Sequence, residues 1–148
     1  KKVKGNQIQI KLLKNSDHRL SDPFDLKITQ QGEKWTQISC SHDGYKRFPG
    51  ENIHRRTWKL SQKSLVVEDI VHGTFKSAVA RFYLHPEIEI FGEYLQLPSG
   101  EKIQYLSQGG HVKFTDSTWH PEFGLSIPSK CIELHFESPE ISMEFTWC

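Results

Sequence analysis

Apolar residues fall on every second position in several short segments of this 148-residue chain, and this alternation most constrains its fold. Successive side chains of a β-strand point to opposite faces, so an alternating segment turns one apolar face to a core. Two denser segments, Leu65–Val67 and Ala78–Leu84, have the composition of interior strands. The clearest alternating segments are Gln7–Leu12, Phe24–Ile28, Ile132–Phe136 and Ile141–Phe145.

Turn-forming residues separate these segments throughout the chain. Examples are Ser21–Pro23, His42–Gly44, Phe48–Gly50 and Pro98–Gly100, in which Asp, Pro and Gly supply the backbone angles of tight turns. No segment has the periodicity of a long amphipathic helix. The sequence therefore predicts an all-β fold, an antiparallel β-sandwich of roughly ten short strands, in one domain spanning residues 1–148.

Charged residues are almost balanced, with 19 Lys and Arg against 18 Asp and Glu and a formal net charge of +1. Such a chain has no strong overall field, so we expect no nucleic-acid partner. No run approaches the roughly 18 apolar residues of a membrane-spanning helix, and we expect no membrane insertion. Because the sequence begins at Lys1 and not at Met, we expect a fragment of a larger protein.

The three cysteines, Cys40, Cys131 and Cys148, form no Cys-x-x-Cys pair and no metal-binding spacing with histidine. Their odd number argues against a framework of disulfides. Two arrangements remain open: three incidental or buried thiols, or one disulfide and one free thiol.

The spacing of the eight histidines does not suit a metal site, which needs three or four converging ligands. The sequence contains no His-x-His or His-Glu-x-x-His pattern, so we expect neither metal nor cofactor in this fragment. It also lacks a Gly-x-Ser-x-Gly turn, a Cys beside a His and a phosphate-binding glycine loop. We therefore expect no catalytic residue here. The histidines are His18, His42, His54, His72, His85, His111, His120 and His135.

Four tryptophans are the natural platforms for a sugar ring: Trp35, Trp58, Trp119 and Trp147. Trp58 shares a strand face with Arg56 and Leu60 if its segment is extended. A tryptophan beside cations suits an acidic glycan, although an Arg side chain that covers a core tryptophan is more common. Trp147 ends an alternating segment, which favours a position in a core or an interface.

Four segments in a fixed order resemble the C-terminal region of the heparinase II/III-like polysaccharide lyases. An Asp-Gly-Tyr turn precedes a strand that contains His-Arg-Arg, and a strand of the type Leu-Val-Val-x-Asp-Ile follows. An Arg-Phe-Tyr-Leu-His-Pro strand and a Trp-His-Pro-Glu-Phe-Gly segment come after it. In this chain the segments are Asp43–Tyr45 with His54–Leu60, Leu65–Gly73, Arg81–Pro86 and Trp119–Gly124.

The resemblance implies a two-part enzyme, an α-helical toroid followed by an antiparallel β-sandwich. It assigns this chain to the sandwich, with an upstream toroid as its partner in the same protein. The family's catalytic Tyr, His and Asn or Glu residues, and its metal ligands, come from the toroid and the start of the β region. These positions precede the segment that matches Asp43. The resemblance also favours the periplasm or cell envelope of a bacterium.

Within the matched region, His54 and Arg56 share one face of an extended strand, and Asp69 lies on the next strand. The structural interpretation is a cross-strand Arg56–Asp69 ion pair. The functional interpretation is that Arg56, with Trp58 and His54, contacts the acid groups of a bound glycan. These three are the candidate substrate-binding residues.

The turn at Val71–Gly73 makes a local hairpin between the Leu65–Val67 strand and the Ala78–Leu84 strand possible. Such a hairpin would place both strands in one sheet.

The sequence thus predicts the non-catalytic C-terminal sandwich of a polysaccharide lyase. The full-length enzyme would cleave uronic-acid-containing glycans by β-elimination, and this domain would support the catalytic domain and form part of the glycan cleft. Its partners would be an acidic polysaccharide and the upstream α-helical domain. The alternatives are a stand-alone carbohydrate-binding or interaction module and an unrecognised barrel enzyme.

Overall fold

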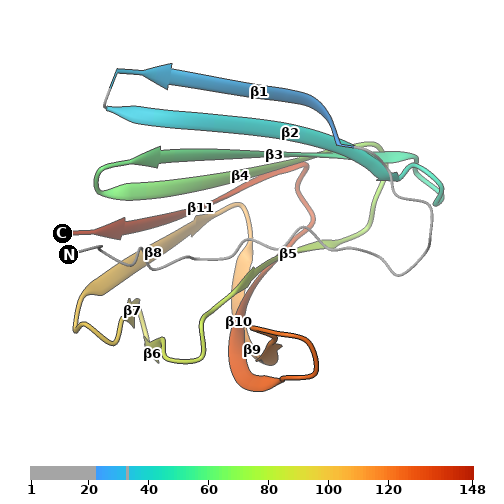
Figure 1. Cartoon of the computed structure of the whole chain (residues 1–148). Coiled ribbons are helices and arrows are strands. Elements are labelled where there is room, and N and C mark those ends of the chain that lie inside the picture. The colour runs from blue at the N-terminus through green and yellow to red at the C-terminus, as the bar shows by residue number, and fades with distance from the viewer. Residues whose placement is uncertain (1–22, 33) are drawn as a thin grey trace.

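The computed structural model describes residues 23–32 and 34–148, which form eleven strands in two layers and no helix (Figure 1). This confirms the predicted all-β sandwich. No helix of the described residues is long and apolar enough to cross a membrane. The strands are β1 (Phe24–Gln31), β2 (Trp35–Tyr45), β3 (Asn52–Ser61), β4 (Ser64–His72), β5 (Ala78–Tyr83), β6 (Glu89–Phe91), β7 (Tyr94–Gln96), β8 (Lys102–Gln108), β9 (His111–Trp119), β10 (Ile127–Phe136) and β11 (Glu140–Trp147).

The larger layer is an eight-stranded antiparallel sheet with the order β1-β2-β3-β4-β11-β8-β7-β6. Strands β1 to β4 follow one another as hairpins, and the last strand, β11, returns to lie between β4 and β8. The smaller layer has three strands in the order β5-β10-β9. Figure 1 shows β1 and β2 at the edge of the large sheet, on the side away from β9.

Most of the strands expected from the sequence are present. The segments Phe24–Ile28, Leu65–Val67, Ile132–Phe136 and Ile141–Phe145 lie in β1, β4, β10 and β11. The dense segment Ala78–Leu84 corresponds to β5, which ends one residue earlier. The predicted strand at Gln7–Leu12 lies outside the described residues.

The hairpin that the turn at Val71–Gly73 makes possible does not form. Strand β4 pairs with β3 and β11, whereas β5 pairs with β10 in the other sheet, so the chain crosses between the layers after His72. Both edges of β4 are therefore already hydrogen-bonded. Strand β5 instead supplies Ala80 and Phe82, which are buried, to the opposite side of the core.

The core lies between the small sheet and the middle of the large one. Val67 of β4 and Met143 of β11 meet Phe82 of β5 and Ile132 of β10, and all four are completely buried. The rings of Phe82 and Phe145 contact edge to face across the layers, with centroids 5.6 Å apart. Trp147 packs partly buried against this core, which agrees with the position expected for it.

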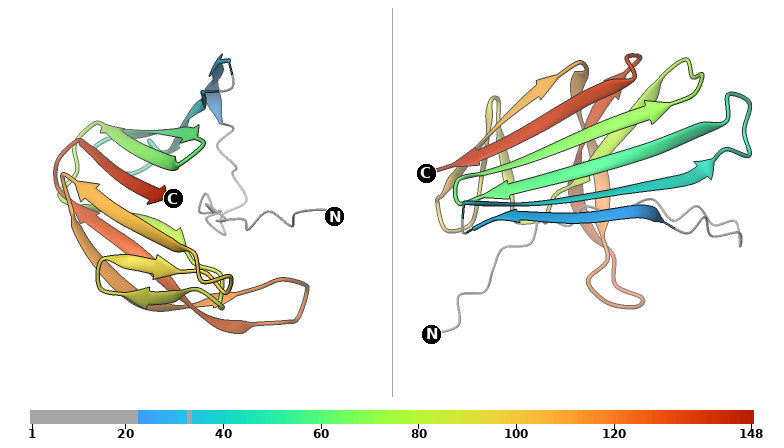
Figure 2. Two further views of the ribbon diagram at one scale, coloured as in Figure 1. Left: turned by 90° about the vertical axis from the view of Figure 1, so that its left-hand side faces the viewer. Right: turned by 90° about the horizontal axis from the view of Figure 1, so that it is seen from above.

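The inner face of the large sheet extends beyond the small sheet (Figure 2). Register places Ile28 of β1 and Ile38 of β2 on the same face as the buried Val67. Yet Ile28 is 63% exposed and Ile38 is 37% exposed, and Leu60 on this face of β3 is 50% exposed. We call these three residues the open inner face. Its apolar side chains continue the core surface but have no second layer over them within the described residues.

All three cysteines are free, so the structure contains no disulfide among them. Cys131 is buried, and burial raises the pKa of its thiol to about 11. Because the thiolate is the reactive form, this cysteine is unreactive in the folded chain.

Candidate functional site

Strand β3 carries the three residues that the sequence singled out, and their alternation places all of them on the inner face. Arg56 lies directly opposite Asp69 of β4, and Trp58 lies opposite Val67. Since Val67 belongs to the core, His54, Arg56 and Trp58 point into the sandwich and not to its outer surface.

The Arg56 guanidinium binds the Asp69 carboxylate with two hydrogen bonds. Nε donates to Oδ1 at 2.6 Å and Nη2 donates to Oδ2 at 2.8 Å. Arg56 is 6% exposed and Asp69 is 1% exposed. The guanidinium carbon also lies 5.4 Å from the centre of the Phe82 ring, on the other layer. The expected cross-strand ion pair is therefore confirmed, and it is buried between the sheets.

Two histidines extend this ion pair toward the end of the sheet. His54 Nε2 lies 2.6 Å from Asp69 Oδ1, and His42 Nε2 lies 3.0 Å from His54 Nδ1. A carboxylate only accepts hydrogen bonds, so Nε2 of His54 carries a proton. When His54 is neutral, its Nδ1 accepts, and Nε2 of His42 is then the donor. Asp69 thus sets the tautomers of both rings, and we call these four side chains the Asp69 network.

The network alters the acidity of its members. Burial alone raises the pKa of Asp69, but hydrogen bonds from His54 and Arg56 outweigh that effect and hold the pKa below its ordinary value. Burial lowers the pKa of His42, and the nearby His54 and Arg56 lower it further, against an opposing effect of Asp43. The Asp69 network therefore favours an ionised Asp69 and a neutral His42.

This geometry assigns a structural role to the polar groups. The ion pair uses Nε and Nη2 of Arg56, and both ring nitrogens of His54 are hydrogen-bonded. Trp58 is partly buried against the core. A role of these three residues in substrate binding stays a prediction.

His42 was not connected with Asp69 by the sequence analysis. Its pairing with His54 depends on the β2–β3 register, which shifts between His42 and Tyr45. The run of turn residues around Phe48–Gly50 marks the hairpin but does not specify this register. With the register known, His42 and His54 are directly opposite each other on the inner face.

No group of three or more His, Cys, Asp or Glu side chains within the described residues is arranged to hold a metal ion. In the Asp69 network the nitrogen and oxygen atoms that could bind a metal are hydrogen-bonded to one another and do not point to a common centre. The chemistry that the network can perform is therefore to orient and neutralise a buried carboxylate.

A family model for heparinase II/III-like C-terminal regions matches residues 5–148. The chain belongs to this family. The match covers the Asp69 network and both sheets, and it confirms the resemblance carried by the Asp-Gly-Tyr, His-Arg-Arg and Val-Val-Glu-Asp segments. No curated protein sequence matches the chain.

Two solved structures share the fold of this heparinase II/III-like domain. The structure of the heparan sulfate lyase HepC from Pedobacter heparinus has a TM-score of 0.68 at 8% identity, over 84% of this chain and 21% of that chain. The structure of a heparinase III gene product has a TM-score of 0.65 at 15% identity, over 86% and 22%. The chain thus spans about a fifth of the length of these neighbours.

We predict that Arg56→Ala lowers the free energy of unfolding of this heparinase II/III-like domain by about 3–5 kcal/mol, because it leaves the buried Asp69 carboxylate without its cation. Arg55→Ala is the matched control. Arg55 lies on the opposite face and donates to Ser39 at 3.3 Å, so its loss should cost only about 1 kcal/mol. Urea unfolding measures both. Equal effects of the two substitutions would show that Arg56 has no special structural role.

We further predict that acidification destabilises the domain in two steps. The folded-state pKa of His42 lies below 6.5 and that of Asp69 below 3.8, so in both cases the unfolded chain binds more protons. Stability from His42 is complete above pH 6.5 and fades as the pH falls below it. Stability from Asp69 fades only below about pH 4.

Urea unfolding at a series of pH values tests these two steps. His42→Gln should remove the change between pH 7 and 5, whereas His72→Gln, at an exposed position of β4, should retain it. If His42→Gln keeps the wild-type pH dependence in that range, the acid sensitivity lies elsewhere.

Proposed function

We propose that this chain is the non-catalytic C-terminal sandwich of a polysaccharide lyase whose complete protein cleaves uronic-acid-containing glycans by β-elimination. Membership of the heparinase II/III-like C-terminal family supports this assignment. The two solved neighbours are named as a heparan sulfate lyase and a heparinase III, and this chain corresponds to about a fifth of each. The reaction therefore belongs to the complete protein, and a bacterial periplasm or cell envelope is its proposed location.

The role of the sandwich in that protein is to support a preceding catalytic domain and to form part of the glycan cleft. The observation that carries this proposal is the open inner face. Ile28, Ile38 and Leu60 continue the core surface beyond the small sheet and stay exposed in the described residues. Apolar side chains in such a position favour burial against another layer, and each aliphatic side chain that becomes fully buried contributes about 1.5–3 kcal/mol.

The preceding part of the same protein is the layer that we assign to the open inner face. Strands β1 to β3, which carry it, come first among the described strands. The upstream partner is an α-helical domain, as the family resemblance implies.

We predict that the isolated chain releases no unsaturated product from heparan-type or polyuronate substrates, whereas the complete protein does. Ultraviolet absorbance of the new carbon–carbon double bond measures the product. The Arg56→Ala chain serves as the control for contamination, since a trace lyase would give the same signal in both preparations. The non-catalytic assignment would be contradicted if the product increased with the amount of pure wild-type chain and disappeared when a residue of this chain was substituted.

We also predict that Ile28→Lys with Leu60→Lys destabilises the complete protein more than the isolated chain. Both residues are exposed in the isolated chain, so there the free energy of unfolding should change by no more than about 0.5 kcal/mol. In the complete protein the substitutions bury two charges and should lower the unfolding temperature by several degrees. Leu106→Lys, at a residue 60% exposed on the outer face of β8, is the matched control. An equal response of both proteins would contradict docking at this face.

A further inference from the structure

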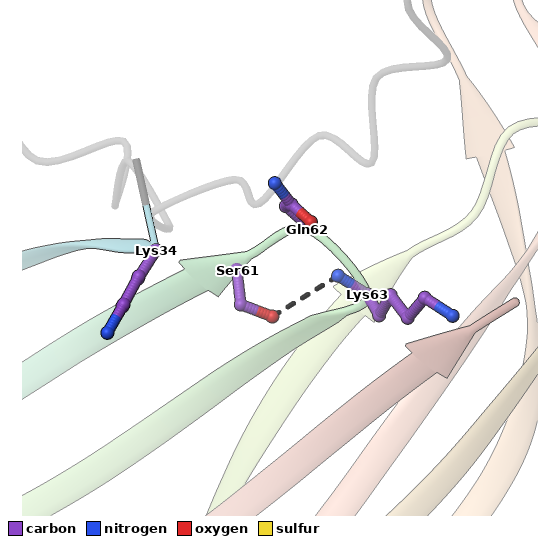
Figure 3. A pocket seen from close by; sticks show the side chains of 4 residues that line it. All are labelled: Lys34, Ser61, Gln62 and Lys63. Atoms are coloured by element: carbon purple, nitrogen blue, oxygen red, sulfur yellow. Dashed lines mark hydrogen bonds between the residues drawn. The ribbon is translucent and has the colours of Figure 1, made fainter. Parts of the chain in front are cut away.

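A hollow of about 450 Å³ lies between two neighbouring turns of the large sheet, at the end farthest from the Asp69 network. Lys34 lines it from the β1–β2 turn, and Ser61, Gln62 and Lys63 line it from the β3–β4 turn (Figure 3). We call this site, together with Trp35 and Lys59, the basic hollow. Of its residues, the sequence analysis named only Trp35, as a platform for a sugar ring, and the proposed contact with the preceding domain does not involve the basic hollow.

Hydrogen bonds hold both turns in place. In the first, the backbone N–H of Lys34 donates to the Gln31 carbonyl at 3.1 Å. In the second, Ser61 Oγ accepts from the backbone N–H of Lys63 at 3.3 Å and from that of Ser64 at 3.0 Å. Trp147 anchors the second turn from β11, because its indole N–H donates to the Gln62 carbonyl at 3.1 Å. Lys63 therefore projects from a turn that Ser61 and Trp147 anchor by hydrogen bonds.

A third cation and an aromatic ring adjoin the hollow. Trp35 lies directly opposite Ser61 in the β2–β3 pairing, so both are on the same face. Its indole N–H donates to Gln31 Oε1 at 2.6 Å, which fixes the ring. The amine of Lys59 lies 4.8 Å from the centre of that ring, within the range of a cation–π contact. Trp35 thus holds a third positive charge beside Lys34 and Lys63.

These lysines have no carboxylate partner among the described residues. Arg56, Arg81 and Lys130 pair with carboxylates, but Lys34, Lys59 and Lys63 form no ion pair with any described residue. Lys76 and Lys113 also form no ion pair with a described residue, so the distinguishing feature of the three lysines is that they gather around one hollow. Three positive charges gathered at one place favour the approach of an anion.

The directions of the side chains decide which kind of anion fits. Figure 3 shows Lys34 and Lys63 on either side of the hollow, with their amines pointing away from each other. They do not converge on one small anion. Separate charges on either side of an open hollow suit an extended ligand with repeated negative groups.

We propose that the basic hollow binds a segment of acidic polysaccharide, with its carboxylate or sulfate groups on Lys34, Lys59 and Lys63. The choice of a glycan rests on the proposed function, whereas the polyanionic character rests on the side chains. Gln62, which is exposed at the rim, can donate to and accept from sugar hydroxyl groups through its amide. The site would bind the polysaccharide chain at a distance from the bond that is cleaved, and this contact would keep the substrate attached to the enzyme.

Calorimetric titration of this chain tests the proposal with three ligands of equal length: a sulfated heparan-type oligosaccharide, an unsulfated polyuronate and a neutral glycan. We expect both acidic ligands, or one of them, to bind with an affinity that falls as ionic strength rises, and the neutral glycan not to bind. Of the two acidic ligands, the one that binds more tightly shows whether sulfate or carboxylate is the preferred group.

The double variant Lys34→Ala/Lys63→Ala should weaken binding about tenfold, since each exposed charge contributes a fraction of that factor. Lys76→Ala/Lys113→Ala is the matched control, because it removes the same charge from exposed positions elsewhere and should retain affinity. Equal losses of affinity in the two double variants would show that the basic hollow is not the binding site. Equally tight binding of a single-stranded DNA of the same charge would overturn its assignment to glycans.

The failure of this proposal can be distinguished from the failure of the proposed function. If no acidic glycan binds the chain but the complete protein forms unsaturated product, the basic hollow is not a glycan site and the lyase assignment stands. If glycan binds at the basic hollow but the complete protein cleaves no uronate glycan, the lyase assignment fails and a binding module remains.

Discussion

The buried ion pair between Arg56 and Asp69 is the interaction on which the rest of the sandwich depends. A carboxylate that is 1% exposed is unfavourable unless its charge is balanced and its oxygens are hydrogen-bonded. Two bonds from Arg56 and one from His54 satisfy that requirement. These contacts exist only when β3 and β4 pair in the observed register, because a shift of one strand by one residue would place Arg56 and Asp69 on opposite faces of the sheet.

The ion pair also marks a boundary in the inner face of the large sheet. On one side of it, β4, β11 and β8 are covered by the small sheet, and Val67 and Met143 are completely buried. On the other side, β1 and β2 carry apolar residues that remain exposed. Arg56 lies at this boundary and contacts Phe82 of the small sheet. A polar network there separates the domain's own core from the surface that we assign to the preceding domain.

The extent of the sequence prediction follows from what each pattern encodes. Alternation is a local property, so β1, β10 and β11 were expected from their own residues. The Arg56–Asp69 pair was accessible because both residues lie in adjacent strands of recognisable segments. The connection after His72 was not accessible from the sequence. Whether the chain forms a hairpin there or crosses to the other layer depends on which strands hydrogen-bond to the two edges of β4. No local signal reports such a choice.

The same limit applies to the candidate sites. The sequence places His54, Arg56 and Trp58 on one face of a strand. Only the tertiary structure shows whether this face points into the sandwich or to its outer surface. The basic hollow joins Lys34 and Lys63 from two turns that are adjacent only because β2 and β3 pair. In the sequence these lysines are two of 19 basic residues without a distinguishing context.

A double-mutant cycle on Arg56→Ala and Asp69→Ala tests the central claim most directly. Each single substitution leaves the other charge buried and unpaired, whereas the double variant removes both charges. The cost of the double variant should therefore be smaller than the sum of the single costs, with a coupling free energy of about 2–3 kcal/mol. Urea unfolding at pH 7 measures all four proteins. Additive single effects would contradict the claim that this ion pair organises the sandwich.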